Sequence, residues 1–406
     1  MTEYKLIGPF SNELEFSLDN VKAKDIISLD KLPLVGEVNP DDIVEMNISM
    51  LGNARELNNS LDNLVENLQT TAIDLGGRIY GGSTLFEDVS EISPSRYRTT
   101  SLSDACATGF LDITSQQIVI GVKDEIAGWE AYNTMKHLTP VLLAISAASP
   151  YKAGKDGELI NTGLQSIRPK QYEELCKFFP DEMWRINPEL KSMDEFQDKI
   201  DIATNKAKEY LESGKMDANW EELKKIRIDE DTNENYSHYP FDSLNDSQIF
   251  WLLRPRPSHE TISSGGDCPM SIEFRGPDLP ITTDYMKVLN NFTIGLTNYI
   301  AHEGGEELIR ELGIDKKEDI FNQYIEAGIH GFNSKFGNSN IGVATNKLIK
   351  YATKGLELGG EESEARNMEI GIQELLKRGS MSDKLVRMNF SDVATIKDYL
   401  VDNLRS

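Results

Sequence analysis

Cysteine, histidine and long apolar runs are scarce in this sequence of 406 residues, and each scarcity excludes a class of protein. The three cysteines, Cys106, Cys176 and Cys268, are odd in number, lie far apart and form no C-x-x-C pair. This argues against a disulfide scaffold and against a zinc site. None of the five histidines forms an H-x-x-x-H pair, and no nucleophilic triad is recognisable. Chemistry by a protein nucleophile is therefore not favoured.

No apolar run approaches the roughly 20 residues that a helix needs to cross a bilayer. The first residues, Met-Thr-Glu-Tyr-Lys, have neither the basic start nor the apolar core of a signal peptide, so we expect a cytoplasmic protein. The glycine cluster at 76–82 lacks the spacing of a P-loop or of a dinucleotide-binding loop, so it is evidence for neither site.

Positively charged residues are also few: the sequence has 42 lysines and arginines against 67 aspartates and glutamates, which gives a net charge of −25. Binding to nucleic acid or to an anionic membrane depends on basic patches, so neither partner is expected. The simplest use of this charge is solubility. An anionic ligand would have to meet arginines that are concentrated locally.

The patterns that are present predict an α+β protein with a largely antiparallel sheet. Leucines at 57, 61, 64 and 68 recur at helical spacing and predict an amphipathic helix over 54–75. A second helix is predicted from about 125 to 146, directly after a strand. The runs 248–254 and 269–275 are interpreted as the two strands of a hairpin.

Length and organisation favour a single catalytic domain over residues 1–406, although two intimately joined domains would also fit. A strongly polar stretch at about 171–237, with helical pattern near 193–211 and 220–226, is interpreted as a peripheral helical insertion. Nearly everything from about 281 to 406 has a helical pattern. These helices are expected to pack within the chain, and they also offer a surface for a homo-oligomer.

Four short apolar stretches carry acidic or amide residues at alternating positions. Successive side chains of a strand point to opposite faces, so the polar residues of each stretch share one side. These residues are Glu13 and Glu15, Glu45 and Asn47, Gln117, and Glu273 and Arg275. Each set alone is typical of the solvent-exposed face of a sheet. Together, rich in carboxylates and ending in an arginine, they favour one polar sheet face that holds cations and phosphate.

Five segments follow one another along the chain: NELEF at 12–16, TPVLLAISAASPY at 139–151, SIR at 166–168, WLLRP at 251–255 and SIEFRGPD at 271–278. In this order they resemble the signatures of the glutamate–cysteine ligase type 2 family of carboxylate–amine ligases, whose sheet is related to that of glutamine synthetase. The resemblance runs from residue 8 to about residue 300 and implies the fold of that family, with a helical C-terminal region.

The resemblance also implies an activity. In this family ATP phosphorylates the γ-carboxylate of glutamate, and the amine of an acceptor amino acid, typically cysteine, attacks the acyl phosphate. A triphosphate and a carboxylate repel each other, so Mg²⁺ or Mn²⁺ held by carboxylates, together with arginines, has to offset their charge. The expected product is γ-glutamylcysteine.

Residue by residue, the resemblance implies one metal site and one nucleotide contact. The metal-binding positions of the family fall on Glu13, Glu15, Glu45 and Glu273. Gln117 matches a position that contacts a cation or a nucleotide phosphate. Many relatives carry histidine or asparagine two residues further on, where this sequence has Val119, and this departure puts one polar contact in doubt.

The arginines are assigned to anions. The resemblance implies that Arg275 binds the transferring phosphoryl group bidentately, with an ion pair to a neighbouring acid as its structural alternative. Arg254 is assigned to phosphate or a substrate carboxylate, and these two arginines with Glu273 are the expected catalytic residues. Arg168 is a candidate for the glutamate α-carboxylate. The remaining substrate-binding candidates are Arg96 and Arg98, for which surface salt bridges are the alternative.

Two alternatives stay open. An acceptor pocket has no compact sequence signature, so a ligase of the same mechanism could use another amino acid or amine. A non-catalytic relative could keep the sheet and bind a nucleotide or metabolite, and Val119 points that way. The retained Glu13/Glu15 pair counts against it, because clustered like charges repel one another without metal.

Overall fold

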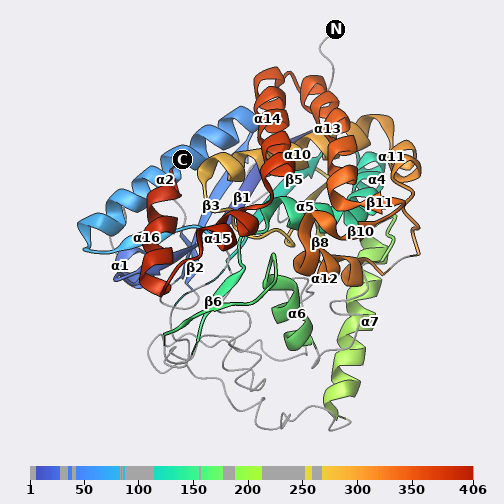
Figure 1. Cartoon of the computed structure of the whole chain (residues 1–406). Helices are drawn as coiled ribbons and strands as arrows, with labels where there is room; N and C mark the ends of the chain where they lie inside the picture. Colours follow the sequence, from blue (N-terminus) through green and yellow to red (C-terminus); the bar gives the residue numbers. More distant parts are fainter. Residues whose placement is uncertain are drawn as a thin grey trace.

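The computed structural model describes most of the chain, coloured along the sequence in Figure 1. The described residues are 6–27, 35–38, 43–82, 84, 86, 114–154, 157–176, 188–212, 252–257, 268–317 and 319–405. They form one large sheet, two small two-stranded sheets and a set of helices.

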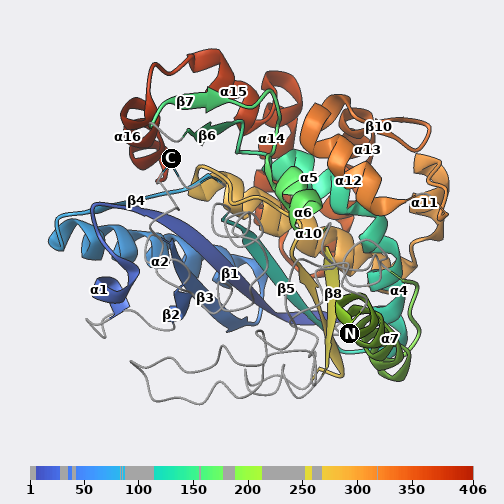
Figure 2. The same ribbon diagram turned by 90° about the horizontal axis from the view of Figure 1, so that it is seen from below.

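A seven-stranded sheet lies at the centre of the fold, in the order β2-β3-β1-β5-β9-β8, with β4 paired to β1 beside this path. Every pair in it is antiparallel. Its strands are β1 (Ile7–Asp19), β2 (Val35–Val38), β3 (Ile43–Leu51), β4 (Arg78–Tyr80), β5 (Gln116–Val122), β8 (Leu253–Pro257) and β9 (Met270–Phe274). The predicted antiparallel sheet is therefore confirmed. The four polar stretches lie on the neighbouring strands β3, β1, β5 and β9. Figure 2 shows β3, β1 and β5 side by side, with β8 toward the far end of the sheet.

The predicted hairpin is present as β8 and β9, but β8 continues to Pro257 instead of ending at residue 254. Pro255 and Pro257 argued against a strand, because proline cannot donate a ladder hydrogen bond. β8 is the last strand in the order of the sheet, and an edge strand tolerates proline on its unpaired side. Residues 248–251 lie outside the described part of the chain.

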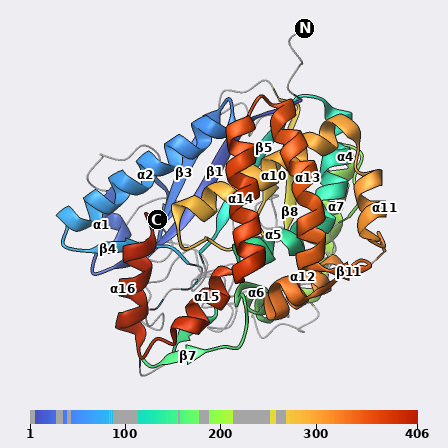
Figure 3. The same cartoon turned by 45° about the horizontal axis from the view of Figure 1, so that its top comes forward.

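Helices cover one face of the sheet: α2, α4 and α10 contact the strands directly, and α13 and α14 pack on α10 (Figure 3). The helices are α1 (Ala23–Ile27), α2 (Ala54–Asp74), α4 (Glu125–Met135), α5 (Thr139–Ser146), α6 (Arg168–Cys176), α7 (Met193–Glu212), α10 (Thr283–Glu303), α11 (Glu306–Leu312), α12 (Ile320–His330), α13 (Ile341–Leu358), α14 (Glu362–Arg378), α15 (Met381–Met388) and α16 (Val393–Asn403). The small sheets are β6 (Tyr151–Ala153) with β7 (Leu159–Asn161), and β10 (Lys335–Phe336) with β11 (Ser339–Asn340). In the part of the chain that is described, no helix is long and apolar enough to cross a membrane.

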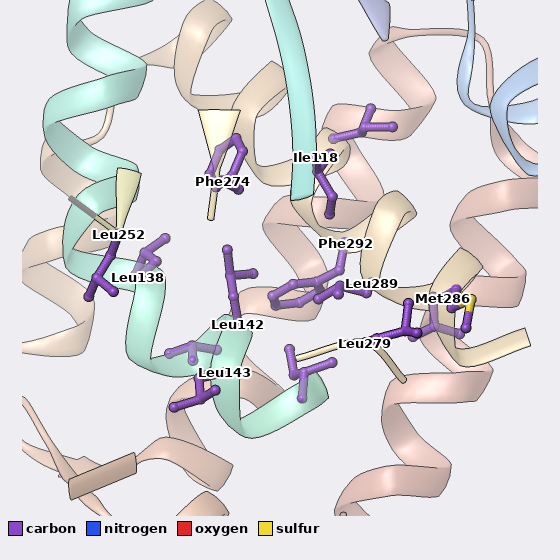
Figure 4. Packing of buried hydrophobic residues seen from close by; sticks show 14 of the residues in the cluster. Ile118, Leu138, Leu142, Leu143, Leu252, Phe274, Leu279, Met286, Leu289 and Phe292 are labelled. Atoms are coloured by element: carbon purple, nitrogen blue, oxygen red, sulfur yellow. The ribbon is translucent and has the colours of Figure 1, made fainter. Parts of the chain in front are cut away.

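The face of the sheet under these helices is apolar. Figure 4 shows Ile118 of β5 and Phe274 of β9 beside Leu142 of α5 and Phe292 of α10. All four of these side chains are 0% exposed. Full burial of a large apolar side chain contributes about 1.5–3 kcal/mol, so this layer holds the strands in register against the helices.

The predicted helix at 54–75 is confirmed as α2, whose first turn is capped from both sides. Asn53 accepts a hydrogen bond from the Glu56 amide at 2.8 Å. The buried carboxylate of Glu361, from the loop before α14, accepts one from the Ala54 amide at 2.8 Å. Both caps satisfy amides that have no partner within a helix.

The prediction of one continuous helix over 125–146 was wrong in one respect. A 3-10 turn at Lys136–Leu138 separates α4 from α5. Pro140 has no amide to donate to the carbonyl of Lys136, and the Thr139 hydroxyl donates to that carbonyl instead, at 2.9 Å. The proline was the sequence signal for this break.

The predicted helical C-terminal region is confirmed from α10 to α16, and the helix near 193–211 is confirmed as α7. The helix expected near 220–226 lies outside the described residues. α16 is tied to the sheet at Asp19, the last residue of β1, which pairs with Lys397 at 3.3 Å and with Arg78 of β4 at 2.5 Å. Arg78 therefore serves as a structural ion-pair partner at this end of the molecule.

Candidate functional site

The register of the strands brings the predicted polar side chains together on the face opposite the helices. The opposed residues are Glu45 and Glu15, Asn47 and Glu13, Glu13 and Gln117, Val119 and Glu273, and Glu273 and Arg254. Carboxylates therefore predominate on β3 and β1, whereas the arginines lie on β8 and directly after β9. The strand pairing confirms that the four polar stretches adjoin, which spacing alone had left as an inference.

Glu13, Glu15 and Glu45 form the carboxylate cluster of this face. One oxygen of each lies within 4.8 Å of the others, and all three side chains are half-buried. Asn47 donates from Nδ2 to Glu45 Oε1 at 3.3 Å and so orients that carboxylate. Carboxylate oxygens gathered in this way are the ligands that Mg²⁺ and Mn²⁺ prefer, so the donor set fits the predicted metal.

Ser115 orients a second carboxylate of the cluster. Its hydroxyl donates to Glu15 Oε2 at 2.7 Å, and the Gln117 amide nitrogen donates to the same hydroxyl at 3.4 Å. Ser115 is 0% exposed and Gln117 7%. Sequence reasoning missed Ser115, although its place two residues before Gln117 put it on the same side of the strand.

The pKa values of the cluster reflect its crowded negative charge. Burial, and after it the carboxylates of Glu273 and Glu15, raise the pKa of Glu13 to about 7. Burial also raises the pKa of Glu15, while Arg168 and the Ser115 hydroxyl act in the opposite direction. Without a cation, the cluster therefore retains a proton at a pH where an ordinary glutamate has lost it.

Glu273 has a different environment from the other three predicted metal ligands. It is 1% exposed, and its carboxylate meets Arg254 Nε at 2.5 Å and Arg256 Nη2 at 3.0 Å. Burial opposes its charge, but Arg254, Arg256 and Arg275 outweigh burial and lower the pKa of Glu273 to about 2. Among the described residues, the group of carboxylates close enough to share one ion contains Glu13, Glu15 and Glu45 but not Glu273.

Arg275 and Val119 lie between the two charged regions. Arg275 shares the face of Glu273, and its backbone amide donates to the Leu252 carbonyl at 3.0 Å. The charges of Arg256 and Arg275 both lower the pKa of Glu13. In the strand register, β5 alone separates Glu13 of β1 from Glu273 of β9, whose carboxylate contacts Arg256. Val119 lies half-buried between Ser11 of β1 and Glu273 of β9, so an apolar side chain interrupts the polar face.

Arg168, the first residue of α6, is 4% exposed. Its guanidinium donates to the carbonyl of Arg275 at 3.0 Å, to the carbonyl of Thr114 at 3.5 Å and to the Tyr172 hydroxyl at 3.3 Å. It thus braces the end of β9 against the start of β5, and its charge acts on Glu15. Arg96 and Arg98, the other two substrate-binding candidates, lie outside the described residues.

Asp278 gathers several of the sequence signatures around one buried carboxylate. It is 0% exposed and accepts hydrogen bonds from the Ala148 amide at 3.1 Å, the Ser149 hydroxyl at 3.0 Å and the Ser166 hydroxyl at 3.0 Å. These partners come from the helix end at 139–151 and from the segment that carries Arg168. Sequence reasoning quoted Asp278 only as the last letter of a motif and gave it no role.

His137, in the turn between α4 and α5, is buried at 1% exposure. Within the described residues, neither ring nitrogen has a hydrogen-bond partner. Burial lowers the pKa of His137 to about 4, and the ring therefore packs in its neutral form.

The model of one protein family, glutamate–cysteine ligase family 2, matches residues 13–297. No curated protein sequence matches the chain.

Among solved structures, a glutamate–cysteine ligase from Francisella tularensis in complex with AMP is 11% identical, with a TM-score of 0.57 over 97% of this chain and 86% of that chain. A bifunctional glutathione synthetase from Pasteurella multocida is 14% identical, with a TM-score of 0.55. That match covers 97% of this chain but 50% of the other, so the chain spans about half the length of that protein. At these identities the structural likeness shows a shared fold.

Proposed function

The chain belongs to glutamate–cysteine ligase family 2, and from this premise we propose that it is an ATP- and Mg²⁺-dependent ligase that joins the γ-carboxyl group of glutamate to the amine of cysteine. Family membership supports a carboxylate–amine ligase in general. The pairing of glutamate with cysteine is the narrower part of the proposal.

One observation supports this function above the others: the carboxylate cluster and the arginines adjoin on one face of the sheet. A site for metal and triphosphate needs both, because the cation must be held by acidic oxygens while the phosphoryl oxygens meet arginine. Glu15 and Glu45 stand opposite each other at one end, and Glu273 stands opposite Arg254 at the other. The face thus changes from acidic to basic over neighbouring strands.

We assign the metal to Glu13, Glu15 and Glu45, with Ser115 and Asn47 orienting the last two carboxylates. When bound, Mg²⁺ supplies positive charge that offsets the negative charge of the phosphates and of the glutamate γ-carboxylate. Arg275 is assigned to the transferring phosphoryl group. Arg254 and Arg256, fixed by Glu273, present further donors on the same side. Gln117 is assigned to a nucleotide phosphate or the cation through its side-chain amide.

The reaction that these residues would support has two steps. An oxygen of the glutamate γ-carboxylate forms a bond to the γ-phosphorus of ATP, the bond from that phosphorus to the β,γ-bridging oxygen breaks, and ADP leaves. The amine of the acceptor then attacks the acyl carbon, phosphate leaves with the bonding electrons, and the amine loses a proton. The chain contributes mainly position and charge to both steps, since no protein nucleophile takes part.

The proposal is tested by measuring ADP release from the purified protein with Mg-ATP and glutamate, with and without cysteine, while γ-glutamylcysteine is followed by mass spectrometry. We expect equal amounts of ADP and dipeptide, and little ADP without cysteine. Glutamate-dependent ADP release without dipeptide would contradict the cysteine assignment and direct a panel of other amines at the same site. Nucleotide binding with no amino-acid-stimulated ADP release would contradict ligase activity itself.

A further inference from the structure

Helix α15 begins far outside the residues matched by the family model, yet its first turn contacts the segment that carries Arg168. The Ser380 hydroxyl donates to Gln165 Oε1 at 2.5 Å, and Gln165 Nε2 donates to Asp383 Oδ1 at 3.0 Å. The Ser382 hydroxyl donates to the carbonyl of Gln165. Ser380 is 1% exposed and Ser382 0%, so these bonds are shielded from water.

Helix α12 holds the same segment from a second side. The amides of Gln165 and Ser166 both donate to the carbonyl of Gly328, at 2.8 and 2.9 Å. A Cβ atom at Gly328 would lie 2.6 Å from Pro169 Cγ, so glycine is what allows the helix to approach this closely. The segment from Gln165 to Pro169 is therefore fixed by contacts from two helices.

From this segment, hydrogen bonds continue to the candidate site. The Ser166 hydroxyl donates to Asp278 at 3.0 Å, and the Arg168 amide donates to the Ser166 hydroxyl at 3.3 Å. The Arg168 guanidinium then donates to the carbonyl of Arg275 at 3.0 Å. Hydrogen bonds thus connect the segment that begins at Gln165, through Ser166 and Arg168, to the backbone of the residue assigned to the phosphoryl group.

We propose that α15 is a positioning element of the active site, and that Gln165 is the residue through which it sets the place of Arg168 and of the end of β9. This inference rests on the proposed function, because it gives Arg275 its role there. Displacement of a reacting group by about 1 Å costs on the order of 100-fold in rate, so a support of this kind affects turnover without touching substrate.

The test exchanges the donor and the acceptor of one hydrogen bond. Gln165→Glu places a carboxylate against the carboxylate of Asp383 and disrupts the contact by repulsion. Asp383→Asn in the same chain restores it, because the new amide donates to the new carboxylate while its oxygen still accepts from the Ser380 amide, as Asp383 does at 2.9 Å. Asp392→Asn is the matched control, since Asp392 caps the neighbouring helix α16 through Thr395 and takes no part in these contacts.

Two readouts separate the parts of the proposal. Gln165→Glu is expected to lower kcat by about 10–100-fold and to speed amide hydrogen exchange at Ser166 and Ile167. The double variant is expected to return both to within about threefold of the unmodified protein. Asp392→Asn is expected to leave both unchanged. The rescue distinguishes a positioned contact from a general loss of stability.

Unchanged hydrogen exchange in Gln165→Glu would show that α15 does not hold the segment through Gln165. Faster exchange with full turnover would show that this contact has no effect on the active site. A chain that releases no ADP even without substitution refutes the proposed function instead. In that event ATP affinity, measured by calorimetry in the same variants, replaces turnover: an unaltered affinity in Gln165→Glu overturns the inference, and a loss that the double variant reverses supports it.

Discussion

The two faces of the central sheet follow opposite rules on the same strands. On β9, Phe274 points into the apolar layer under the helices and is 0% exposed, whereas its neighbours Glu273 and Arg275 share the polar face. On β5, Ile118 and Gln117 divide in the same way. The apolar face is stable without a ligand, because its side chains are removed from water by packing against one another. The other gathers like charges, whose repulsion is relieved by a retained proton, by the nearby arginines or by a bound ion.

The largest expected effect comes from breaking the apolar face. Phe274→Ala is expected to lower the free energy of unfolding by about 3–5 kcal/mol, because it removes buried ring atoms and leaves a cavity. Urea unfolding followed by circular dichroism measures this loss. Phe274→Leu is the control and is expected to cost clearly less. A loss below about 1 kcal/mol for Phe274→Ala would mean that the layer tolerates voids, contrary to the usual cost of cavities in a packed core.

The adjacent residue tests the polar face. Arg275→Ala is expected to lower turnover at least about 100-fold, because it removes a charged donor from the transferring phosphoryl group. The thermal unfolding midpoint is expected to change less than after Phe274→Ala, since the side chain is half-buried and Arg254 and Arg256 still contact the carboxylate of Glu273. ADP release and thermal unfolding are measured on the same sample, with Arg275→Lys as the variant that keeps charge without the planar fork. Undiminished turnover in Arg275→Ala would remove the residue from the site.

The carboxylate cluster predicts how stability depends on pH. The pKa of Glu13 is raised in the fold from 4.5 to about 7, so between these values the folded, metal-free protein holds a proton that the unfolded chain has lost. Stability from this group is therefore greatest at low pH and decreases as pH rises toward 7, by no more than about 3 kcal/mol.

Thermal unfolding of metal-free protein from about pH 5 to pH 8 measures this decrease. Glu13→Gln is expected to flatten the profile, and Mg²⁺ is expected to stabilise the unsubstituted protein most at the alkaline end. A midpoint independent of both pH and Glu13 would contradict the crowding of charge inferred for the cluster.

The smallest effect is expected at Val119. Val119→Asn is expected to change the free energy of unfolding by less than about 1 kcal/mol, because the side chain is half-buried on a face that already carries polar groups. Ile118→Asn is the matched substitution on the other face, where an unpaired amide in an apolar layer costs about 1–3 kcal/mol. Similar losses from both variants, measured by urea unfolding, would abolish the distinction between the faces.

Alternation along the strands was enough to predict which residues face together, because the side-chain period of a strand is fixed. The family resemblance implied Glu13, Glu15, Glu45 and Glu273 as metal ligands, and the register brings the first three within reach of a single ion. The order of the strands could not be read from spacing. β1 ends at Asp19 and β5 begins at Gln116, yet the two strands are neighbours in the sheet.

Partners supplied by distant segments were the part that sequence could not predict. Glu273 was assigned to metal from the family resemblance, and no local pattern reveals that Arg254 and Arg256 of the next strand contact its carboxylate. Its role toward metal stays a prediction. Arg168 was assigned to a substrate carboxylate, whereas its guanidinium contacts backbone carbonyls, which leave no mark on sequence. Its role toward substrate stays a prediction.

The place of β1 in the sheet has a consequence for synthesis of the chain. β1 is made first but lies in the interior of the sheet, so its pairing with β3 on one edge and with β4 on part of the other edge is available early on the ribosome, while the rest of that second edge waits for β5. The arginines of β8 and β9 emerge later still. Gln165 and Asp383 are 218 positions apart, an interval on the order of 10–40 s of translation. Nascent chains therefore acquire their acidic centre early, and by our inference about α15 they stay catalytically silent until its residues have joined the fold.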